Sequence, residues 1–246
     1  MGKRERLDKL LVERGLVASR EEGRRRILAG EVLVNDQPFS KAGSLVDATS
    51  PIRLKGKASP YVSRGGVKLE RALSEFRVDV EGKIVLDVGA STGGFTDCLL
   101  AFGARRVYAV DVSYGQLDWK LRNDPRVVVL EKRNIRYLKA EELTQPPQLA
   151  TIDASFISLR LVLPQVRGLL TPAGEILALI KPQFEVGKGK VGKGGVVRQH
   201  EEHVRVIEEI KEASTALQLK VVGVIESPLL GPEGNKESFI YLRKTD

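Results

Sequence analysis

Four charged residues stand beside apolar runs in a way that could bring them together for chemistry. Asp153 and Lys181 each follow such a run, Glu237 comes just before one, and Lys68 lies on an amphipathic segment. A Lys–Asp–Lys–Glu set is suited to removing the proton of a ribose hydroxyl, provided that one lysine is neutral. A lysine pKa falls from about 10.4 when burial or a second cation disfavours the charge, and carboxylates raise it again. The two acids are therefore expected to orient the base. Each of the four residues taken alone is more simply explained as an ordinary surface charge, and it is their common place beside the apolar runs that points to chemistry.

A glycine-rich run forms a second chemical feature. It reads Leu86-Asp87-Val-Gly89-Ala-Ser-Thr-Gly93-Gly94-Phe95-Thr, after an apolar segment and before a helical one. Backbone N–H groups at such a place let a ligand approach closely. Serine replaces the second glycine of the dinucleotide motif G-x-G-x-x-G, and the run does not match the phosphate-binding P-loop motif. The next apolar run ends at Asp111, 22 residues after Gly89, where an acid can accept hydrogen bonds from ribose hydroxyls.

This combination resembles a site for S-adenosylmethionine (SAM) more than a site for a dinucleotide. The expected cofactor-binding residues are Asp87, Gly89, Ala90, Ser91, Gly93, Gly94, Phe95, Asp111 and Asn134. Asp87 would face the amino group of the cofactor, and Asn134 would lie over its adenine. The alternative for Asp87 is a carboxylate that caps a helix or orders the loop.

A parallel sheet would bring these residues to one edge. Apolar runs predict seven strands, at Ile84–Val88, Arg106–Val110, Val127–Leu130, Leu149–Ile152, Ile176–Ile180, Val221–Ile225 and Phe239–Leu242. Helical segments are predicted at Lys68–Phe76, Thr96–Phe102, Leu159–Leu170 and His200–Leu217. This alternation predicts an α/β fold with a mainly parallel, Rossmann-like sheet. Together with the SAM-type loop, the predicted sheet resembles that of SAM-dependent methyltransferases. The last two strands have no helix between them, so we expect an antiparallel hairpin at the sheet edge.

The first quarter of the chain is the most basic part. Residues 1–64 hold 14 basic and 8 acidic residues, which leaves +6 of the total charge of +8. Leucines at helical spacing from Leu7 and a capping box at Ser19 predict two helices, and short apolar runs predict a small sheet. Arg24, Arg25 and Arg26 cluster on the second helix, where they suit the phosphates of a structured RNA. The alternative is a solvated helix face.

The order of motifs in this region resembles the S-four-type RNA-binding domain. The matching runs are Arg6-Leu-Asp8-Lys-Leu-Leu, Ser19-Arg20 and Ile27-Leu-Ala-Gly30-Glu-Val-Leu-Val-Asn35. We expect this small α+β domain over residues 1–57, a linker over 58–64 and a second domain over 65–246. Pro60 and the glycine pair at 65 and 66 mark the junction, because both are poor interior residues of a helix or strand.

Over nearly its whole length the chain resembles the TlyA (hemolysin A) family of FtsJ-like methyltransferases. The matching runs are Tyr61-Val-Ser-Arg64-Gly-Gly-Val-Lys68, Asp87-Val-Gly-Ala-Ser-Thr-Gly-Gly-Phe-Thr, Val110-Asp111-Val-Ser-Tyr114-Gly-Gln116, Asp153-Ala-Ser-Phe156-Ile-Ser158-Leu, Lys181-Pro-Gln-Phe-Glu185 and Gly187-Lys-Gly-Lys190-Val-Gly-Lys-Gly-Gly195. The resemblance implies SAM-dependent methylation of a ribose 2′-hydroxyl in ribosomal RNA, in particular of cytidine. It also implies a catalytic tetrad of Lys68, Asp153, Lys181 and Glu237, with Lys181 as the base.

Ribosomal RNA and ribosomal subunits are then the expected partners. The expected RNA-binding residues are Arg6, Lys9, Arg20, Arg24, Arg25, Arg26, Arg64, Lys188, Lys190 and Lys193. The stretch Gly187–Gly195 is expected to be a mobile loop that closes on RNA phosphate, or else a solvated connector. A single cysteine, Cys98, and the lack of a secretory signal or a membrane-spanning apolar run favour a cytoplasmic protein without a membrane partner. We expect no metal, because His200 and His203 lack a third ligand nearby in the sequence.

Two other functions stay open at this point. A non-catalytic RNA-binding or ribosome-assembly protein could keep a SAM-type fold. The family name hemolysin also implies a membrane-acting protein, although no residue named above supports that activity. Three aromatic residues, Tyr114, Trp119 and Tyr137, could stack on bases, but burial in the core is the expectation for them.

Overall fold

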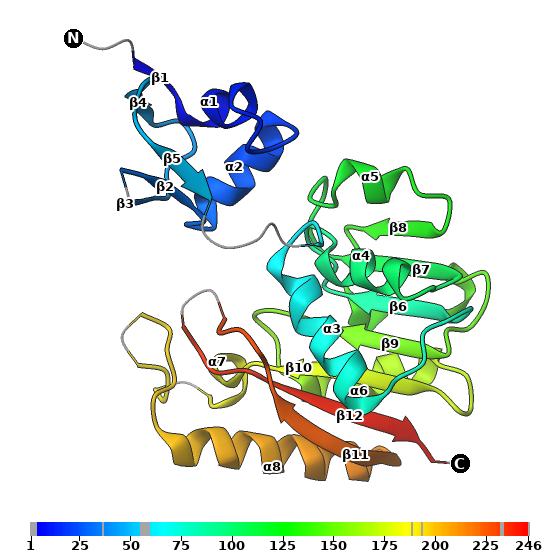
Figure 1. The fold of residues 1–246 in the computed structure, drawn as a ribbon. Coiled ribbons are helices and arrows are strands. Elements are labelled where there is room, and N and C mark those ends of the chain that lie inside the picture. Colours follow the sequence, from blue (N-terminus) through cyan, green and yellow to red (C-terminus); the bar gives the residue numbers. More distant parts are fainter. Residues whose placement is uncertain are drawn as a thin grey trace. The chain divides into compact units, whose positions relative to one another are not determined.

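Two compact units make up the protein. The computed structural model describes residues 4–35, 37–54, 60–187, 189–192, 194–231 and 234–245. Contacts within the chain divide it into Met1–Ala58 and Ser59–Asp246, which are drawn in blue and in cyan to red in Figure 1. The predicted linker falls partly outside the described residues.

In the first unit, two helices pack with short strands. The elements are α1 (Leu7–Glu13), α2 (Arg20–Leu28), the pair β1 (Arg4–Arg6) with β4 (Leu45–Asp47), and β2 (Val32–Val34) between β3 (Gln37–Phe39) and β5 (Ile52–Leu54). Leu7, Leu11 and Ile27 are completely buried between them. The predicted helix cap is confirmed, because Ser19 Oγ accepts a hydrogen bond from Glu22 N at 3.1 Å. The β1–β4 pair was not predicted, since three-residue strands carry almost no periodic signal.

The second unit is built on one seven-stranded sheet. Its strands are β6 (Ile84–Val88), β7 (Arg106–Asp111), β8 (Val127–Glu131), β9 (Leu149–Ile152), β10 (Glu175–Ile180), β11 (Leu219–Glu226) and β12 (Ser238–Lys244), in the order β11-β12-β10-β9-β6-β7-β8. The five strands from β6 to β10 are parallel, which confirms the predicted sheet. The edge hairpin is also confirmed. Within it β12 lies between β10 and β11 and runs antiparallel to both, so the reversed strand is one position in from the edge.

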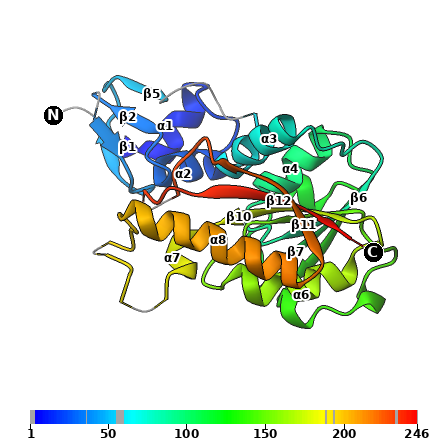
Figure 2. The same ribbon diagram turned by 90° about the horizontal axis from the view of Figure 1, so that it is seen from below.

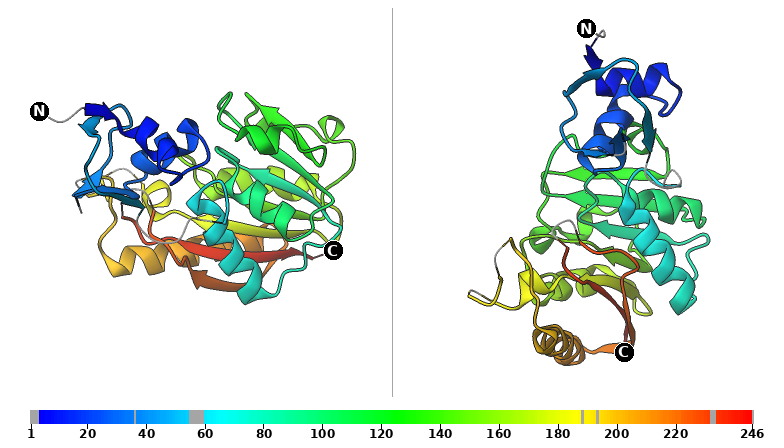
Figure 3. Two further views of the ribbon diagram at one scale, coloured as in Figure 1. Left: turned by 45° about the horizontal axis from the view of Figure 1, so that its top comes forward. Right: turned by 60° about the vertical axis from the view of Figure 1, so that its left-hand side comes forward.

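Helices cover both faces of this sheet. They are α3 (Arg64–Phe76), α4 (Gly94–Ala101), α5 (Trp119–Arg122), α6 (Leu159–Leu169), α7 (Pro182–Glu185) and α8 (His200–Ala216), with short 3-10 turns η1 (Ile135–Tyr137) and η2 (Ala140–Glu142). Figure 2 shows α3 and α4 on one face and α6 and α8 on the other. Figure 3 shows the same division from two further directions.

Alternate residues of each strand serve the two faces. In β6, Leu86 and Val88 pack toward α6 and Val85 packs toward α3 and α4, as the period of two in a strand requires. The ends of the parallel strands therefore present side chains in a fixed order, and Asp87, Asp111 and Asp153 lie at or beside three neighbouring ends.

The glycine pair at the predicted junction lies inside a helix, contrary to expectation. Helix α3 begins at Arg64, four residues before the predicted start, with Ser63 in the extended conformation of an N-cap. A Cβ built on Gly66 would lie 2.3 Å from Tyr61 Cγ. The glycines are therefore used for close packing against the incoming chain in the first turn of the helix, where their weak helix propensity costs little.

Candidate active site

The glycine-rich loop after β6 passes very close to its neighbours. Gly89 has a φ of +82° and Gly93 a φ of +95°. A Cβ on Gly89 would lie 2.7 Å from the Asp153 carbonyl oxygen, and one on Gly93 would lie 2.3 Å from Leu121 Cδ1. Neither position accepts a side chain without displacement. The loop therefore sits directly against the end of β9, and its residues Gly89 and Ser91 line a cavity.

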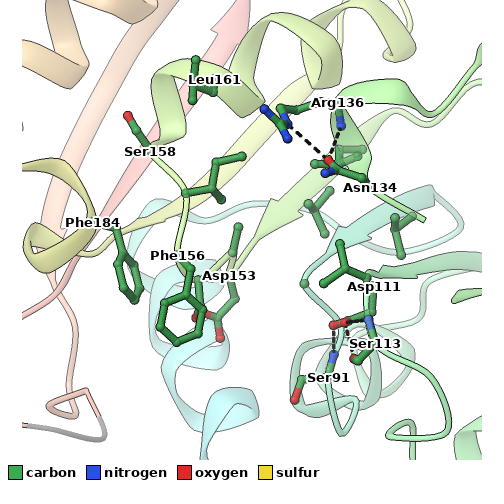
Figure 4. A pocket seen from close by; sticks show the side chains of 18 of the residues that line it. Ser91, Asp111, Ser113, Asn134, Arg136, Asp153, Phe156, Ser158, Leu161 and Phe184 are labelled. Atoms are coloured by element: carbon green, nitrogen blue, oxygen red, sulfur yellow. Dashed lines mark hydrogen bonds between the residues drawn. The ribbon is translucent and has the colours of Figure 1, made fainter. Parts of the chain in front are cut away.

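Asp111, at the end of β7, is tied to this loop. Its Oδ2 accepts a hydrogen bond from Ser91 N at 2.8 Å, and its Oδ1 accepts hydrogen bonds from Ser113 N at 2.8 Å and from the Ser113 hydroxyl. Figure 4 shows these three residues together at the rim of a cavity. The carboxylate is thereby fixed in orientation while still lining the cavity.

This cavity, called the cofactor cavity below, has Gly89, Ser91, Asp111, Asn134, Asp153 and Phe156 among its lining residues. Its volume is about 1030 Å³, at the upper end of the range of small-molecule sites. Asn134 begins η1, and its Oδ1 accepts a hydrogen bond from Arg136 N at 3.1 Å. Acceptors from successive strand ends thus face one space, as expected for a nucleoside ligand on an α/β sheet.

Asp87 is not among the residues that line the cofactor cavity. Its side chain is fully buried, and its two oxygens accept hydrogen bonds from Thr96 Oγ1 at 2.6 Å and Thr151 Oγ1 at 3.0 Å. Burial raises the pKa of Asp87 to about 7, against the opposing effect of the two threonine hydrogen bonds. These contacts favour the alternative of a carboxylate that orders the loop and α4, and the expectation that Asp87 faces the cofactor stays a prediction.

The four predicted tetrad residues line one pocket, called the tetrad pocket. It has a volume of about 280 Å³, and Arg64, Ser91 and Ser155 also contribute to its wall. Lys68 Nζ lies 2.6 Å from Glu237 Oε2, and Lys181 Nζ lies 2.6 Å from Asp153 Oδ1. Two lysine–carboxylate pairs therefore stand side by side, although Lys68 and Glu237 are 169 residues apart in the chain.

Burial differs between the two pairs. The side chains of Lys68 and Glu237 are 11% and 0% exposed, so the carboxylate of the first pair is removed from solvent. The side chains of Lys181 and Asp153 are 11% and 24% exposed. Since a desolvated charge requires a close partner, the Lys68–Glu237 pair is suited to holding the pocket together, and the more open Lys181–Asp153 pair can meet an incoming hydroxyl.

The cofactor cavity and the tetrad pocket share part of their walls. Gly89, Ser91, Asp153 and Ser155 line both. Ser155 Oγ accepts a hydrogen bond from Lys181 Nζ at 2.9 Å. A group bound in the large cavity and a group held by Lys181 would therefore meet at this shared wall.

The run that starts at Asp153 and the run that starts at Lys181 contact each other beside the shared wall. Glu185, which is buried, accepts hydrogen bonds from Ser158 Oγ at 2.5 Å and Leu159 N at 2.8 Å. Its burial raises its pKa. The rings of Phe156 and Phe184 lie 5.0 Å apart between their centres, as Figure 4 shows. These contacts fix Lys181 relative to Asp153, because each pair joins the segment after β10 to the segment after β9.

Phe156 differs from the other residues that join these two runs in its exposure and its backbone conformation. It is 90% exposed and has a φ of +63°, in the left-handed region that a bulky residue rarely adopts. It also lines the cofactor cavity. An exposed aromatic ring held in a strained backbone beside reactive groups is a surface on which a planar ligand can stack.

The glycine-lysine segment is anchored to its surroundings in the part that the structure describes. Lys190 Nζ lies 2.8 Å from Glu202 Oε1 on α8. The fully buried Asn235 donates through Nδ2 to Gly195 O at 2.8 Å and accepts at Oδ1 from Val197 N at 2.9 Å. Asn235 therefore joins this segment to the chain that carries Glu237. Lys188 and Lys193 lie outside the described residues.

In the first unit, four of the six predicted RNA-binding residues fall into two groups by their contacts. Arg6, Arg20 and Arg24 all contact the buried carboxylate of Asp8, at 2.9, 3.2 and 3.1 Å, with side chains that are 43–54% exposed. Arg26 is only 11% exposed and pairs with Glu22 and Glu31. Arg26 is therefore better explained as a residue that stabilises the unit.

Comparisons with known proteins decide the family. Residues 61–244 match the model described as FtsJ-like methyltransferase, and residues 5–51 match the S4 domain. A Bacillus subtilis (strain 168) protein assigned as the rRNA methyltransferase YqxC is 51% identical over 98% of this chain and 86% of its own length. The 16S/23S rRNA (cytidine-2′-O)-methyltransferase TlyA of Mycobacterium tuberculosis (strain ATCC 25618 / H37Rv) is 46% identical over 99% and 91%. This chain belongs to the TlyA family of FtsJ-like methyltransferases.

Solved structures agree with the TlyA assignment. A Streptococcus thermophilus structure, assigned as a hemolysin, is 43% identical, covers 100% of this chain and 90% of its own, and gives a TM-score of 0.79. More distant SAM-dependent methyltransferases, 15–20% identical with TM-scores of 0.52–0.56, share the fold alone. Among the described residues, no helix has the length and apolar character needed to cross a membrane.

Several residues of this TlyA-family site escaped the sequence analysis. Ser155 and Phe156 lie in a run that carried the resemblance, but only the folded chain reveals their contact with Lys181 and their exposure. Asn235 precedes Glu237 by two residues, and a lone asparagine carries no signal of its role. Among the loop residues, Gly89, Ala90, Ser91, Gly94 and Phe95 line one or both cavities, and Gly93 instead packs on Leu121.

Proposed function

We propose that this protein transfers a methyl group from SAM to a ribose 2′-hydroxyl in ribosomal RNA, with cytidine as the target. The observation that carries the proposal is the meeting of the cofactor cavity with two lysine–carboxylate pairs at Asp153 and Ser155. The names of the M. tuberculosis relative and of the B. subtilis relative support the substrate.

The residues of the cofactor cavity fit SAM. The carboxylate of Asp111 is oriented by Ser91 and Ser113 and suits ribose hydroxyls, and Asn134 lines the cavity from the next strand along the sheet. The close approach of Gly89 to Asp153 leaves backbone in place of a side chain beside the shared wall. When bound, SAM supplies a methyl group made electrophilic by its positively charged sulfur.

The chain's own contribution is to prepare the hydroxyl. Lys181, once it has released its own proton, is the group whose Nζ takes the 2′-hydroxyl proton, and Asp153 and Ser155 hold that nitrogen in place. Lys68 and Glu237 neutralise each other in the interior. They also line the tetrad pocket, where they orient the incoming ribose. Such positioning of a nucleophile and a base accounts for much of the rate that enzymes of this kind need.

The proposed division of labour follows the two units. Residues 1–57 bind RNA, residues 58–64 link the units, and residues 65–246 carry the reaction. The proposed RNA contacts in the first unit are Arg6, Arg20, Arg24 and Arg25. Lys9 is a further proposed contact, and in this structure it forms ion pairs with Glu5 and Glu13. In the second unit the proposed contacts are Arg64, which is exposed beside the tetrad pocket, and the segment of Lys188, Lys190 and Lys193.

The ring of Phe156 gives the target base a place to stack. Since the ring is 90% exposed and belongs to the cofactor cavity, a base turned out of its RNA strand would lie on it while its ribose points toward Lys181. The partners are then ribosomal RNA and the ribosomal subunits, and the place of action is the cytoplasm.

The test is methyl transfer from labelled SAM to ribosomal subunits isolated from a strain that lacks the gene. Nucleoside digestion and mass spectrometry of the product should find the label on the 2′-oxygen of cytidine. Replacement Lys181→Ala should abolish labelling, and Lys220→Ala, at an exposed lysine of β11, should leave it unchanged. A label on a base, or full labelling by the Lys181→Ala variant, would contradict the proposal. Binding of RNA without any transfer by the wild type would favour a non-catalytic RNA-binding protein.

A further inference from the structure

Three arginines of the first unit converge on a single carboxylate. Arg6 donates through Nε to Asp8 Oδ1 and through Nη2 to Asp8 Oδ2, both at 2.9 Å. Arg20 Nη2 and Arg24 Nε reach the same Oδ2 at 3.2 and 3.1 Å. Asp8 itself is 0% exposed. One buried negative charge thus holds three positive charges within a few ångströms of one another.

The fold of α1 and α2 brings these side chains together. Arg20 and Arg24 are four residues apart on α2 and so lie on the same face of that helix. Between them is Gly23, where an added Cβ would lie 3.3 Å from the Asp8 carbonyl oxygen. The missing side chain lets α2 approach α1 closely enough for both arginines to reach Asp8. Arg6 reaches it from the residue that precedes α1.

The cluster has an excess of charge and of donors. Three guanidinium groups against one carboxylate leave a local charge of +2. The three arginine side chains are 43%, 52% and 54% exposed. A guanidinium carries five N–H donors, and the contacts to Asp8 use two from Arg6 and one each from Arg20 and Arg24. Donors on the exposed side stay available to a second anion, and their planar forks match phosphate oxygens.

We propose that Asp8 is a positioning residue that gathers Arg6, Arg20 and Arg24 into one site for neighbouring phosphates of an RNA backbone. Without Asp8, the three like charges repel and the flexible side chains separate. With it, they are held in a fixed arrangement, and less freedom is lost when RNA binds. The hydrogen bonds from Arg6 lower the pKa of Asp8, so the carboxylate keeps its charge throughout the physiological range. This inference rests on the proposed function only in taking RNA as the ligand.

The first test replaces Asp8 by asparagine in the full-length chain. Asp8→Asn raises the positive charge of the unit by one, so simple attraction between opposite charges predicts tighter RNA binding. Our proposal predicts binding weaker by roughly tenfold, with the slope of log affinity against log salt reduced by about one. The probe is unmodified ribosomal subunits, with affinity measured by sedimentation over a range of salt concentrations.

The matched control is Glu13→Gln, which raises the charge of the same unit equally. Glu13 lies on α1 and pairs with Lys9, away from the arginine cluster. This variant should bind RNA as tightly as the wild type or more tightly. If Asp8→Asn binds as tightly as Glu13→Gln with the same salt dependence, the proposal is overturned.

A second pair of variants keeps the test decisive if Asp8→Asn fails to fold. Arg24→Lys preserves charge at a half-exposed position but removes the planar fork, and should weaken RNA binding several-fold. Arg26→Lys preserves charge on the same helix, at a residue whose partners are Glu22 and Glu31, and should leave binding unchanged. Equal affinities for the two variants would contradict the proposal.

Methyl transfer by the wild type, measured in the same preparations, separates this inference from the proposed function. If the wild type binds RNA and the Asp8 effect is present without methyl transfer, the proposed reaction fails and the arginine site stands. If transfer is normal and all variants bind alike, the arginine site fails and the reaction stands.

Discussion

The two units of this protein use the same kinds of charge in different proportions. In the tetrad pocket, Lys68 and Lys181 each face one carboxylate, Glu237 and Asp153, at 2.6 Å. In the first unit, Asp8 alone faces three arginines. Balanced pairs leave no net charge and so can be buried, whereas the unbalanced cluster must stay near solvent and attracts a polyanion.

Asp87 supplies a third case beside these two. Its carboxylate accepts hydrogen bonds from the hydroxyl groups of Thr96 and Thr151, which carry no charge. Its charge is therefore disfavoured by burial, which is the reason for its raised pKa. We propose a different use for the acid in each of these environments: to orient a base, to gather cations for an external anion, and to order a loop.

The largest effect is expected from Lys181→Ala. Loss of the base should lower the rate of methyl transfer by about 100-fold to 10,000-fold, the usual contribution of a general base. RNA affinity should stay within a factor of two or so of the wild type, because we propose that the affinity comes mainly from the first unit. Single-turnover rates and sedimentation binding on the same preparations provide the two numbers. A loss of affinity as large as the loss of rate would remove the distinction between the two units.

Breaking the buried pair should act on stability as well as on rate. Glu237→Gln leaves Lys68 without its charged partner at a site that is 8% exposed, and should lower the free energy of unfolding of the second unit by about 3 kcal/mol. The double variant Lys68→Met/Glu237→Gln should recover most of this stability and none of the activity. Urea unfolding measures the first quantity, and methyl transfer measures the second. If Glu237→Gln is as stable as the wild type, Lys68 and Glu237 do not form a buried pair of balanced charges.

Asp87 predicts a pH dependence of stability. Its pKa is about 7 in the folded protein and about 3.9 when unfolded, so the folded state holds the proton more tightly. The stability that this group contributes is full below about pH 4 and is lost as the pH rises through 7, by roughly 2 kcal/mol between pH 5 and pH 7. Asp87→Asn should remove this part of the dependence. The measurement is urea unfolding of both proteins at the two pH values. If the free energy of unfolding changes equally in both proteins, Asp87 is not the cause.

The smallest effect is expected from Arg26→Gln. Its ion pairs with Glu22 and Glu31 are at 3.1 and 3.5 Å, and their loss should cost about 1 kcal/mol of stability. RNA affinity and its salt dependence should not change. Thermal unfolding and RNA binding of the variant test this directly. A smaller slope of log affinity against log salt would show that Arg26 contacts RNA.

The sequence predicted the sheet and the polar residues at its functional edge because both depend on local patterns. Apolar runs mark the strands, and polar residues where those runs stop mark the functional edge, so Asp153 and Lys181 could be placed before the structure was known. The pairing of Lys68 with Glu237 depends on how α3 packs beside β12, and no local pattern contains that information. The burial of Asp87 likewise depends on Thr96 and Thr151, which lie on two other elements.

Exposure was the weakest part of the sequence analysis. Tyr114, Trp119 and Tyr137 were expected in the core, yet they are 71%, 73% and 71% exposed. The aromatic side chain alone favours burial, but each of these residues lies in a segment whose inward positions are taken by others, such as Leu117, Leu121 and Leu138. For the same reason the sequence did not indicate that Phe156 is exposed, or that the Arg26 side chain is less exposed than those of Arg20 and Arg24 on α2.

The most direct test of the account compares one variant from each unit. Lys181→Ala and Arg24→Gln are each assayed for RNA affinity and for the single-turnover rate of methyl transfer at saturating RNA. We predict that Lys181→Ala binds RNA normally and transfers almost no methyl group, and that Arg24→Gln binds weakly but reaches the wild-type rate once saturated. If both variants lose affinity and rate together, the separation of the two units into a reacting part and an RNA-gathering part is wrong.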